Sequence, residues 1–416
     1  MIRIILEICS TDLESQLFVY PLMNLLYTIT AYPPSIGGAQ FYTHQLAKAM
    51  THKHGVQVAS LWDTNRTDWL LGTTLRAGGE DYDYEYEGIR VHLMGFSPLE
   101  KAAMLPAVLA YYPLMDLALP YLANFTRSHL ELYANHIDLI HNVRVGREPL
   151  SLASLQIARQ RDIPFFFTPL HHPRWKGWLY RHYHEIYRQA DGVIALTQAE
   201  KETLIELGVD EKRITVTGFG PILANSADGE AFRQKYSLGH DPVVLFLGQK
   251  FEYKGVAPLL KSTQSVWFRF PETRFLFIGP RTEFSRRLFR EVSDQRILEL
   301  DTVSLQEKSD ALSACSILCV PSSQESFGGV YTEAWSFGKP VMGCNIHAVS
   351  ELFTDGVDGL LVKQDPAENA EAIITLISDP GLANAMGAAG QQKMKEKYNW
   401  ERLAAITEQA YLDVLA

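Results

Sequence analysis

The sequence predicts an α/β protein built from two Rossmann-like, doubly wound domains that face a central cleft. Three observations support this prediction. The chain has 416 residues, of which 47% are hydrophobic, and this exceeds what one hydrophobic core usually holds. Apolar strands alternate with amphipathic helical stretches twice, from Leu25 to Thr217 and from Val243 to about Tyr398. A segment rich in turn residues, 218–229, separates the two series, and we place the domain boundary between residues 220 and 221.

An alternating acidic and aromatic run, 80–88, lies within the first series. It contains Asp81 and Asp83, and a pair of aspartates at this spacing can hold a divalent cation on a diphosphate. The alternation, followed at once by the apolar Ile89, is instead typical of an exposed edge strand or loop. We therefore expect no metal site there.

The segment from Ala102 to Phe125 is strongly apolar, and Asp116 is its only charged residue. It is nearly long enough to cross a bilayer, but Pro106, Pro113 and Pro120 argue against one spanning helix. Two interpretations stay open. The segment forms short helices in the core of the first domain, or it forms a lip that dips into a membrane surface.

The most informative motif runs from Ser316 to Pro340. It begins with an apolar strand that shows no alternation, as expected for a strand buried on both faces of a parallel sheet. After Pro321 come a polar loop, the tripeptide Phe327-Gly328-Gly329 and a stretch with helical spacing. At such a junction, glycines let backbone N–H groups approach a diphosphate, which the positive end of the helix dipole favours. Phosphate can bind there without a metal.

Two carboxylates belong to the same motif. Glu325 lies in the loop and Glu333 lies eight positions later, just over two helical turns away. Both can therefore face one bound ligand at different points, and carboxylates suit vicinal hydroxyl groups. Together with the glycines, this pattern predicts a sugar-nucleotide pocket.

Charge and cysteine content exclude other classes of protein. The formal net charge of −10 argues against nucleic-acid binding, which needs a concentrated basic face. The four cysteines, Cys9, Cys315, Cys319 and Cys344, are too few and too clustered for a secreted disulfide framework, which favours a cytoplasmic location. For Cys315 and Cys319, core packing is favoured over a metal or redox pair.

The pattern of Glu325, seven residues and Glu333, with Phe327-Gly328-Gly329 inside it, resembles the retaining glycosyltransferases of family four, which have the GT-B fold. Segments 190–197 and 207–216 are similar to the end of the family's first domain. The resemblance implies an acceptor-side domain at 1–220 and a nucleotide-sugar domain at 221–398. Residues 399–416 resemble the family's terminal helix, which crosses back to pack on the first domain.

In the first domain, Tyr32 to Gln40 resembles the family's glycine loop, so Gly37 and Gly38 would approach the donor phosphates. Segment 165–173 is similar to the strand that ends in an active-site histidine, and His172 is the better-aligned histidine.

The family's first strand corresponds to residues 25–30, which leaves 1–22 as an additional segment before Met23. We favour an appendage or a translation-start artefact over a signal peptide, because acidic residues interrupt its apolar run.

In the second domain, Val243 to Gly255 resembles the first strand and the phosphate loop. The family places an arginine directly after the loop's first glycine and a lysine five residues later, and both neutralise the donor diphosphate. This chain has Gln249 and Lys254 at these positions. Because Gln249 carries no charge, leaving-group stabilisation would fall on Lys254, helped by Lys250 if the loop turns it inward.

The resemblance implies transfer of a sugar, with retention, from a nucleoside-diphosphate sugar to a glycan or lipid-linked acceptor, without a metal or other cofactor. Glu333 would hold the ribose hydroxyls, Glu325 the sugar hydroxyls, and Lys254 with the loop amides the diphosphate. His172 would border the anomeric carbon as a hydrogen-bond donor. A lipid-linked acceptor would bring the protein to the inner face of the membrane through Ala102 to Phe125.

Two alternatives to a transferase stay open. One is a non-catalytic sugar-nucleotide-binding protein, which the uncharged Gln249 favours. The other is a hydrolysing sugar-nucleotide epimerase of similar architecture, which the glutamate motif disfavours.

Overall fold

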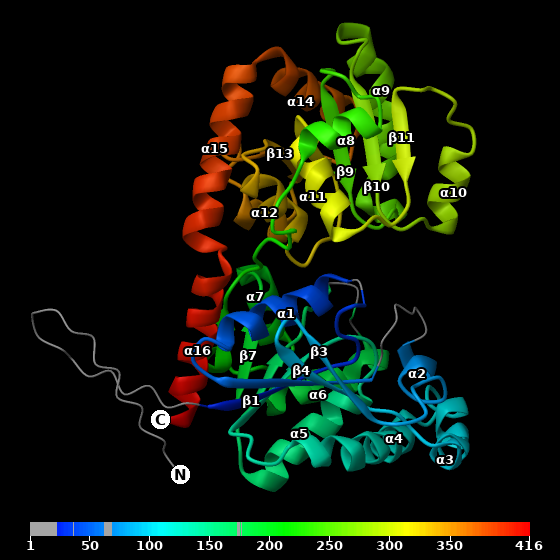
Figure 1. The fold of residues 1–416 in the computed structure, drawn as a ribbon, viewed down its shortest axis with the longest axis vertical. Coiled ribbons are helices and arrows are strands. Elements are labelled where there is room, and N and C mark those ends of the chain that lie inside the picture. Colours follow the sequence, from blue (N-terminus) through cyan, green and yellow to red (C-terminus); the bar gives the residue numbers. More distant parts are fainter. Residues whose placement is uncertain (1–22, 36, 62–68, 173–174, 176) are drawn as a thin grey trace, which may run out of the picture.

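The computed structural model describes residues 23–416 except 36, 62–68, 173–174 and 176, and it shows two α/β domains stacked along the long axis (Figure 1). The predicted division into two doubly wound domains is confirmed. The additional segment 1–22 lies outside the described residues.

The described part of the first domain has an eight-stranded sheet in the order β3-β4-β2-β1-β5-β6-β7-β8. Neighbouring strands are parallel, except that β3 runs antiparallel to β4 at the edge. The acidic and aromatic run therefore forms an edge strand, as predicted. The strands are β1 (Asn24–Ile29), β2 (Gly55–Ser60), β3 (Tyr82–Tyr86), β4 (Ile89–Leu93), β5 (Leu139–Val143), β6 (Phe165–Thr168), β7 (Gly192–Ala195) and β8 (Ile214–Val216).

The second domain has a six-stranded, wholly parallel sheet in the order β11-β10-β9-β12-β13-β14. Counted from β9 this is the order 3-2-1-4-5-6 of a doubly wound fold, which reverses direction between β9 and β12. Its strands are β9 (Val243–Leu247), β10 (Arg274–Ile278), β11 (Ile297–Leu300), β12 (Ile317–Val320), β13 (Val341–Cys344) and β14 (Leu360–Val362).

Helices connect the strands and cover both sheets (Figure 1). In the first domain they are α1 (Gly38–Met50), α2 (Trp69–Gly72), α3 (Pro98–Leu109), α4 (Met115–Leu130), η1 (Glu131–Tyr133), α5 (Pro149–Arg161), η2 (Trp178–Tyr180), α6 (Arg181–Gln189), α7 (Gln198–Glu206) and η3 (Glu211–Arg213). The second domain and the carboxyl-terminal part contain α8 (Gly229–Lys235), η4 (Glu252–Lys254), α9 (Val256–Arg269), α10 (Glu283–Phe289), α11 (Leu305–Ala314), α12 (Gly329–Ser336), α13 (His347–Leu352), α14 (Pro366–Ser378), α15 (Pro380–Lys397) and α16 (Trp400–Leu415).

Burial explains why the central strands form where the sequence is continuously apolar. All residues of β9 and β12 are buried, because helices cover both faces of the sheet. The core of the second domain continues into the first through stacked rings, among them Tyr42 of α1, Phe219 of the link and Phe327. A separate core fills the other face of the first sheet.

The last two helices join the domains along one side of the molecule (Figure 1). Helix α15 packs on α12, and α16 crosses to the first domain, where it packs on α1 and on β7 and β8. The hydroxyl of Tyr411 lies 3.1 Å from that of Tyr27, and Glu408 forms an ion pair with Lys53 and a hydrogen bond with His54. Contacts 384 positions apart in sequence thus anchor the carboxyl terminus.

The apolar segment from Ala102 to Phe125 forms most of α3 and α4, with Pro106 and Pro120 inside the helices. One side of each helix is buried in the first-domain core. The other side of each helix and the turn between the helices expose large apolar residues: Leu105, Leu109, Tyr112, Leu114, Leu117 and Tyr121. Core packing therefore explains the apolar residues on the buried side of this segment but not those on its exposed side. Across the described residues, none of the helices combines the length and hydropathy needed to cross a membrane.

The aspartate run and the cysteines, both weighed above as metal or redox sites, make the following contacts. Asp81 accepts hydrogen bonds from the Gly95 amide and from His129. No group of three metal-ligating side chains occurs among the described residues. Cys315, Cys319 and Cys344 are buried free thiols, which confirms core packing for the predicted pair, whereas Cys9 lies outside the described residues.

Candidate functional site

The reversal of strand order between β9 and β12 places two loops side by side at the carboxyl edge of the second sheet. The loop after β9 carries Gln249 and Lys254, and the loop after β12 carries Glu325. Ligands of doubly wound sheets bind in the crevice at such a point. The structure brings two predicted site residues together here, since Lys254 Nζ lies 2.6 Å from Glu325 Oε1. Both side chains are largely shielded, with exposed fractions of 17% and 10%.

Glycine is required where these loops pass close to other groups. At Gly255, φ is +79°, and an added Cβ would lie 2.2 Å from the Pro321 carbonyl oxygen. At Gly328, φ is +88°, a conformation that precedes α12 and that other residues rarely adopt. The predicted strand, loop and helix start are therefore present, with the Gly328 and Gly329 amides at the amino end of α12.

The second glutamate of the motif is also paired. Glu333 lies in α12, is 4% exposed, and its Oε1 is 2.7 Å from Nζ of Lys308 in α11. Burial raises the pKa of Glu333, and the charge of Lys308 opposes that shift. The other oxygen, Oε2, makes no hydrogen bond among the described residues, although the backbone of Ile222 lies close enough to oppose the rise in the pKa of this carboxyl group. Glu333 can therefore accept a hydroxyl hydrogen bond from a ligand.

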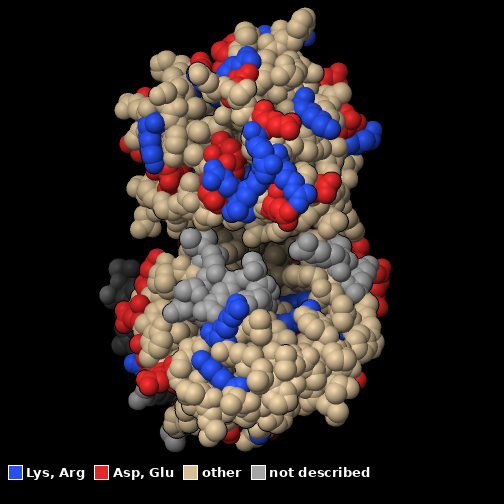
Figure 2. Space-filling model, turned by 90° about the vertical axis from the view of Figure 1, so that its right-hand side faces the viewer, with Lys and Arg blue, Asp and Glu red and all other residues tan. Residues whose placement is uncertain are grey.

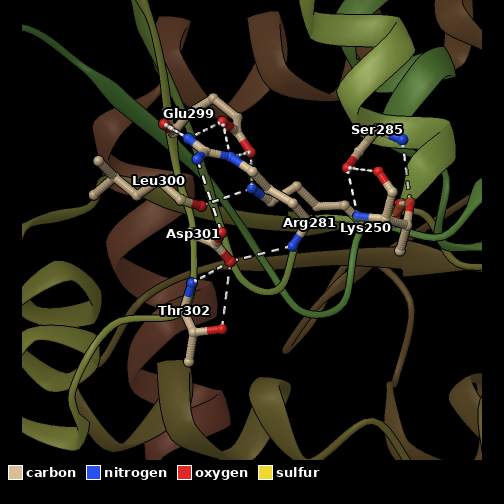
Figure 3. Close-up of polar contacts among 8 residues, drawn as sticks. Lys250, Arg281, Ser285, Glu299, Leu300, Asp301 and Thr302 are labelled. Atoms are coloured by element: carbon tan, nitrogen blue, oxygen red, sulfur yellow. Dashed lines mark hydrogen bonds and ion pairs between the residues drawn. The ribbon is translucent and has the colours of Figure 1, made fainter. Parts of the chain in front are cut away.

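Lys250 lies in a different place from the one its predicted role requires. Its side chain is fully buried, and its ammonium contacts Glu299 and donates to the Leu300 carbonyl oxygen at 2.6 Å (Figure 3). Arg281 shares the same carboxylate, with Nε 2.8 Å from Glu299 Oε2. Burial lowers the pKa of Lys250. Binding of a donor phosphate by Lys250 would require these contacts to break, whereas the neighbouring Gln249 is exposed.

The histidine segment of the first domain meets both loops. Ser326 Oγ donates a hydrogen bond to the His171 carbonyl oxygen at 3.1 Å, and the rings of His172 and Tyr253 are 6.0 Å apart. His172 is half-buried and borders the Lys254 loop through Tyr253, whereas His171 is buried in the first domain. The structure thus places the predicted histidine opposite the predicted donor loops.

A buried carboxyl group fixes the backbone of the histidine segment. Glu200 of α7 accepts the backbone N–H of His171 at 2.5 Å and that of Leu196 at 2.7 Å. Burial raises the pKa of Glu200 to about 7, against the effect of these two amides.

The glycine loop of the first domain lies at the start of α1. An added Cβ at Gly37 would lie 2.2 Å from Oε1 of Gln40, but at Gly38 it would meet no atom within 4 Å. Because the Gln40 amide is the end of a flexible side chain that can move, packing requires glycine at neither position. Their approach to a phosphate stays a prediction.

Sequence reasoning missed Lys308, Ser326 and Tyr253. Nothing in the local pattern marks them, because each acquires its place through a contact with a distant segment, such as the 155 positions between Ser326 and His171.

Two family models match the chain. The "Glycosyl transferase 4-like domain" matches residues 37–220, and "Glycosyl transferases group 1" matches residues 241–379. Together they take in more than three quarters of the sequence.

Similar curated proteins are D-inositol 3-phosphate glycosyltransferases. The one from Kribbella flavida is 30% identical over 244 residues, which is 55% of this chain and 57% of that protein. The one from Rhodococcus jostii is 29% identical over 53% of this chain and 52% of that protein. The chain thus matches little more than half the length of these relatives.

Solved structures resemble the whole chain. HepE of Anabaena in complex with UDP-glucose gives a TM-score of 0.71 at 18% identity, covering 94% of this chain and 99% of that one. Sucrose-phosphate synthase from Thermosynechococcus elongatus gives 0.70 at 20% identity with the same coverage. At this identity the likeness establishes the fold, which is GT-B. The two family models, the curated relatives and the fold agree, and the chain belongs to the group 1 glycosyltransferases.

Proposed function

We propose that the protein is a retaining glycosyltransferase that moves a sugar from a nucleoside-diphosphate sugar to a glycan or lipid-linked acceptor, without a metal ion. This proposal rests on two lysine–glutamate contacts near the point where the strand order of the second sheet reverses. Lys254 pairs with Glu325 and Lys308 pairs with Glu333, beside the amides that begin α12. This arrangement offers cations for a diphosphate and carboxylates for hydroxyl groups within one crevice.

The donor would lie along this crevice with its ribose hydroxyls on Glu333 and its diphosphate on Lys254 and the amides of Gly328 and Gly329. Without a donor, Lys254 and Glu325 neutralise each other at 2.6 Å. When a diphosphate takes up the ammonium, Glu325 becomes available to accept hydrogen bonds from the transferred sugar. The fixed cation takes the place that a metal ion has in other transferases.

In the reaction, the bond between the anomeric carbon and the leaving phosphate oxygen breaks, and its electron pair stays on the diphosphate. The acceptor oxygen bonds to the same face of the anomeric carbon, and its proton passes to a phosphate oxygen. Negative charge grows on the diphosphate, so positioned donors there stabilise the transition state more than the ground state. His172, which closure of the domains holds beside the sugar, would donate a hydrogen bond to it.

A specific observation supports one alternative, a non-catalytic sugar-nucleotide-binding protein. Gln249 is exposed and uncharged, and Lys250 is held by Glu299 and Leu300, so neither supplies a second cation to the diphosphate. Of these three residues, Lys254 alone would stabilise the leaving group.

The first domain, which would bind the acceptor, has a surface suited to an acceptor at the cytoplasmic face of a membrane. The exposed side of α3 and α4 combines Leu109, Leu114 and Leu117, whose exposed fractions are 76%, 54% and 72%. A surface of this kind supports peripheral contact with the inner face of a membrane. The resemblance of this chain to the family supports a lipid-linked or glycan acceptor.

The test is a screen of nucleoside-diphosphate sugars, beginning with UDP-glucose. Release of nucleoside diphosphate is measured with chelator present, with and without a membrane extract as acceptor source. We expect release for a particular donor from the wild-type protein and a large loss in Glu325→Ala. The matched control is Glu368→Ala, which removes a surface glutamate paired with the exposed Lys363. Donor binding without turnover under every acceptor condition would establish the binding protein instead, and dependence on added Mg²⁺ would contradict the metal-independent mechanism. The anomeric configuration of the product, read by NMR, tests retention.

A further inference from the structure

The first sheet has its own reversal of strand order, between β1 and β5. The loop after β5 carries Arg144 and Arg147, and it touches the end of β1, where Thr30 Oγ1 donates to the Val145 carbonyl oxygen at 2.5 Å. The Arg144 amide donates to the Thr168 carbonyl oxygen at 3.0 Å, at the end of the strand that leads to His172. By the general rule for doubly wound sheets, this reversal is a second candidate position for a ligand, on the edge of the first domain that faces the donor loops.

Aromatic rings line the two arginines. The guanidinium carbon of Arg144 is 3.8 Å from the ring centroid of Tyr183 and 4.0 Å from that of Trp175. Arg147 lies 5.0 Å from the Tyr112 ring, and the Tyr180 ring is 5.7 Å from Arg144 and 5.6 Å from Arg147.

Together with the two arginines, these rings form a continuous series of contacts, which we call the aromatic wall. It leads from His172, whose ring is 5.8 Å from that of Trp175, out to the exposed apolar side of α3 and α4 at Tyr112, which is 45% exposed. An acceptor that reaches the donor sugar from the apolar surface would pass along it.

The positive charge of this wall is only partly neutralised. Arg144 is 4% exposed and has no ion pair among the described residues, while the carboxylate of Glu148 lies 3.9 Å from Arg147 Nη1. That Nη1 is buried and has no hydrogen-bond partner in the part of the chain described. Glu148 itself accepts the Tyr111 hydroxyl.

Another nearby acid, Glu200, has a pKa raised by burial to about 7 and so carries only part of a negative charge near neutral pH. Burying an arginine without a full counterion is costly unless a ligand completes the pairing.

On the first domain, the surface below the hollow agrees with this charge balance, whereas basic and acidic side chains are intermingled on the second domain above it (Figure 2). In a chain with a net charge of −10, the face in Figure 2 shows Lys and Arg below the hollow on the first domain, while Asp and Glu lie toward the margins of that domain. A broad area without charged side chains adjoins them on the same face.

We propose that the carboxyl edge of the first sheet, at Arg144 and Arg147, binds an oxyanion carried by the acceptor, of the phosphate or phosphodiester class. Arg147, whose Nη2 donates to the Tyr112 hydroxyl at 3.0 Å, offers its Nη1, unpartnered within the described part of the chain, to the oxyanion, and Arg144, fixed between two rings, adds its charge from behind. The aromatic wall covers the apolar or sugar part of the acceptor next to that group. This inference rests on the proposed function, because it names the chemistry of the acceptor for the same active cleft.

The first experiment separates this site from the donor site. Binding of inorganic phosphate is measured by calorimetry with UDP at saturation, so that the donor diphosphate position is filled. We expect phosphate to bind to the wild-type protein and to bind about tenfold or more weakly to Arg147→Gln, which loses a charge-assisted contact. The matched control is Arg181→Gln, since Arg181 lies beside the same apolar surface but is neutralised by Asp116 at 2.7 Å. No phosphate binding in the presence of UDP, or equal loss in both variants, would overturn the proposal.

A conservative variant separates binding from structure. Arg147→Lys keeps the charge but not the planar fork, so phosphate affinity should fall less than in Arg147→Gln. Thermal denaturation identifies a purely structural role. The proposal fails if both variants melt far below the wild type and the loss of phosphate affinity follows the drop in melting temperature in each of them. A weakened UDP affinity in Arg147→Gln would assign the arginine to the donor and would also overturn it.

The second experiment identifies the source of the oxyanion. The membrane extract is partitioned into organic and aqueous phases, each with and without phosphatase treatment, and acceptor-dependent release of nucleoside diphosphate is measured. Loss of stimulation after phosphatase supports a phosphate, in a lipid if the organic phase stimulates and in a free compound if the aqueous phase does. Stimulation that survives phosphatase and is equal in wild type and Arg147→Gln contradicts the inference but leaves the transferase standing. If no donor turns over at all, the proposed function fails, and the calorimetry with phosphate still decides whether the anion site exists.

Discussion

Lys254 is the residue on which the proposed chemistry depends most. Its ammonium lies 2.6 Å from Glu325, and exposed fractions of 17% and 10% mean that water screens neither group fully. In Lys254→Met the developing charge on the diphosphate loses one positioned cation. Removal of one such donor costs about 2.7–4 kcal/mol in the transition state, which is about 10²–10³ in kcat. We expect the upper part of that range, because Gln249 is neutral and Lys250 is held by Glu299.

The assay is release of nucleoside diphosphate at saturating donor, with donor affinity measured separately by calorimetry. The control is Lys363→Met, which removes a lysine that is 82% exposed and paired with Glu368 on the surface of the same domain. Gln249→Arg in the Lys254→Met background should restore part of the lost rate, since it returns a cation to the same loop. A Lys254→Met rate within threefold of the wild type would refute the assignment of Lys254 as the leaving-group stabiliser.

Three further predictions concern glutamates with distinct partners. Glu333→Ala should weaken UDP binding by about 10- to 100-fold in calorimetry, because the ribose loses a charged acceptor, and an unchanged affinity would exclude Glu333 from the nucleotide site. Glu200 has a pKa of about 7 in the folded protein, above its unfolded value, so its contribution to stability is complete below about pH 4.5 and is lost as the pH rises to about 7. In urea denaturation, the free energy of unfolding of the wild type should fall by up to about 3 kcal/mol relative to that of Glu200→Gln across that interval. Equal pH dependence of the two free energies would contradict the raised pKa of Glu200. Glu351 of the second domain accepts the backbone N–H groups of Gln198 and Ala199, which begin α7 of the first, at 2.7 and 2.6 Å. Glu351→Ala should therefore loosen the two domains, seen as a larger radius of gyration in small-angle scattering, and an unchanged radius would show that other contacts hold them together.

Much of the fold could be predicted because its signals are local. The β9 segment is apolar at all five positions and is buried at all five, as a strand between two helix layers must be. The strand, loop and helix start around Glu325 were predicted from glycines and helical spacing over about 25 residues, and the structure has them. The half-exposed α3 and α4 were harder to interpret, because a segment that is apolar on every side shows no periodicity that would separate its buried face from its exposed one.

The sequence by itself determined the α/β class, the two domains and the glutamate and glycine motif, since these depend on residue type and spacing within short stretches. Only the tertiary structure decided which side chains meet. Lys254 turns to Glu325, 71 positions away, whereas Lys250 turns to Glu299 in the edge strand β11. Two lysines four positions apart in one loop carry no local mark of this difference. The same holds for Arg144 and Arg147, whose aromatic partners come from three separate segments. Strand order brings these segments together at the edge of a sheet. There, distance and burial decide which charged groups pair. Spacing along the sequence contains no information about these distances.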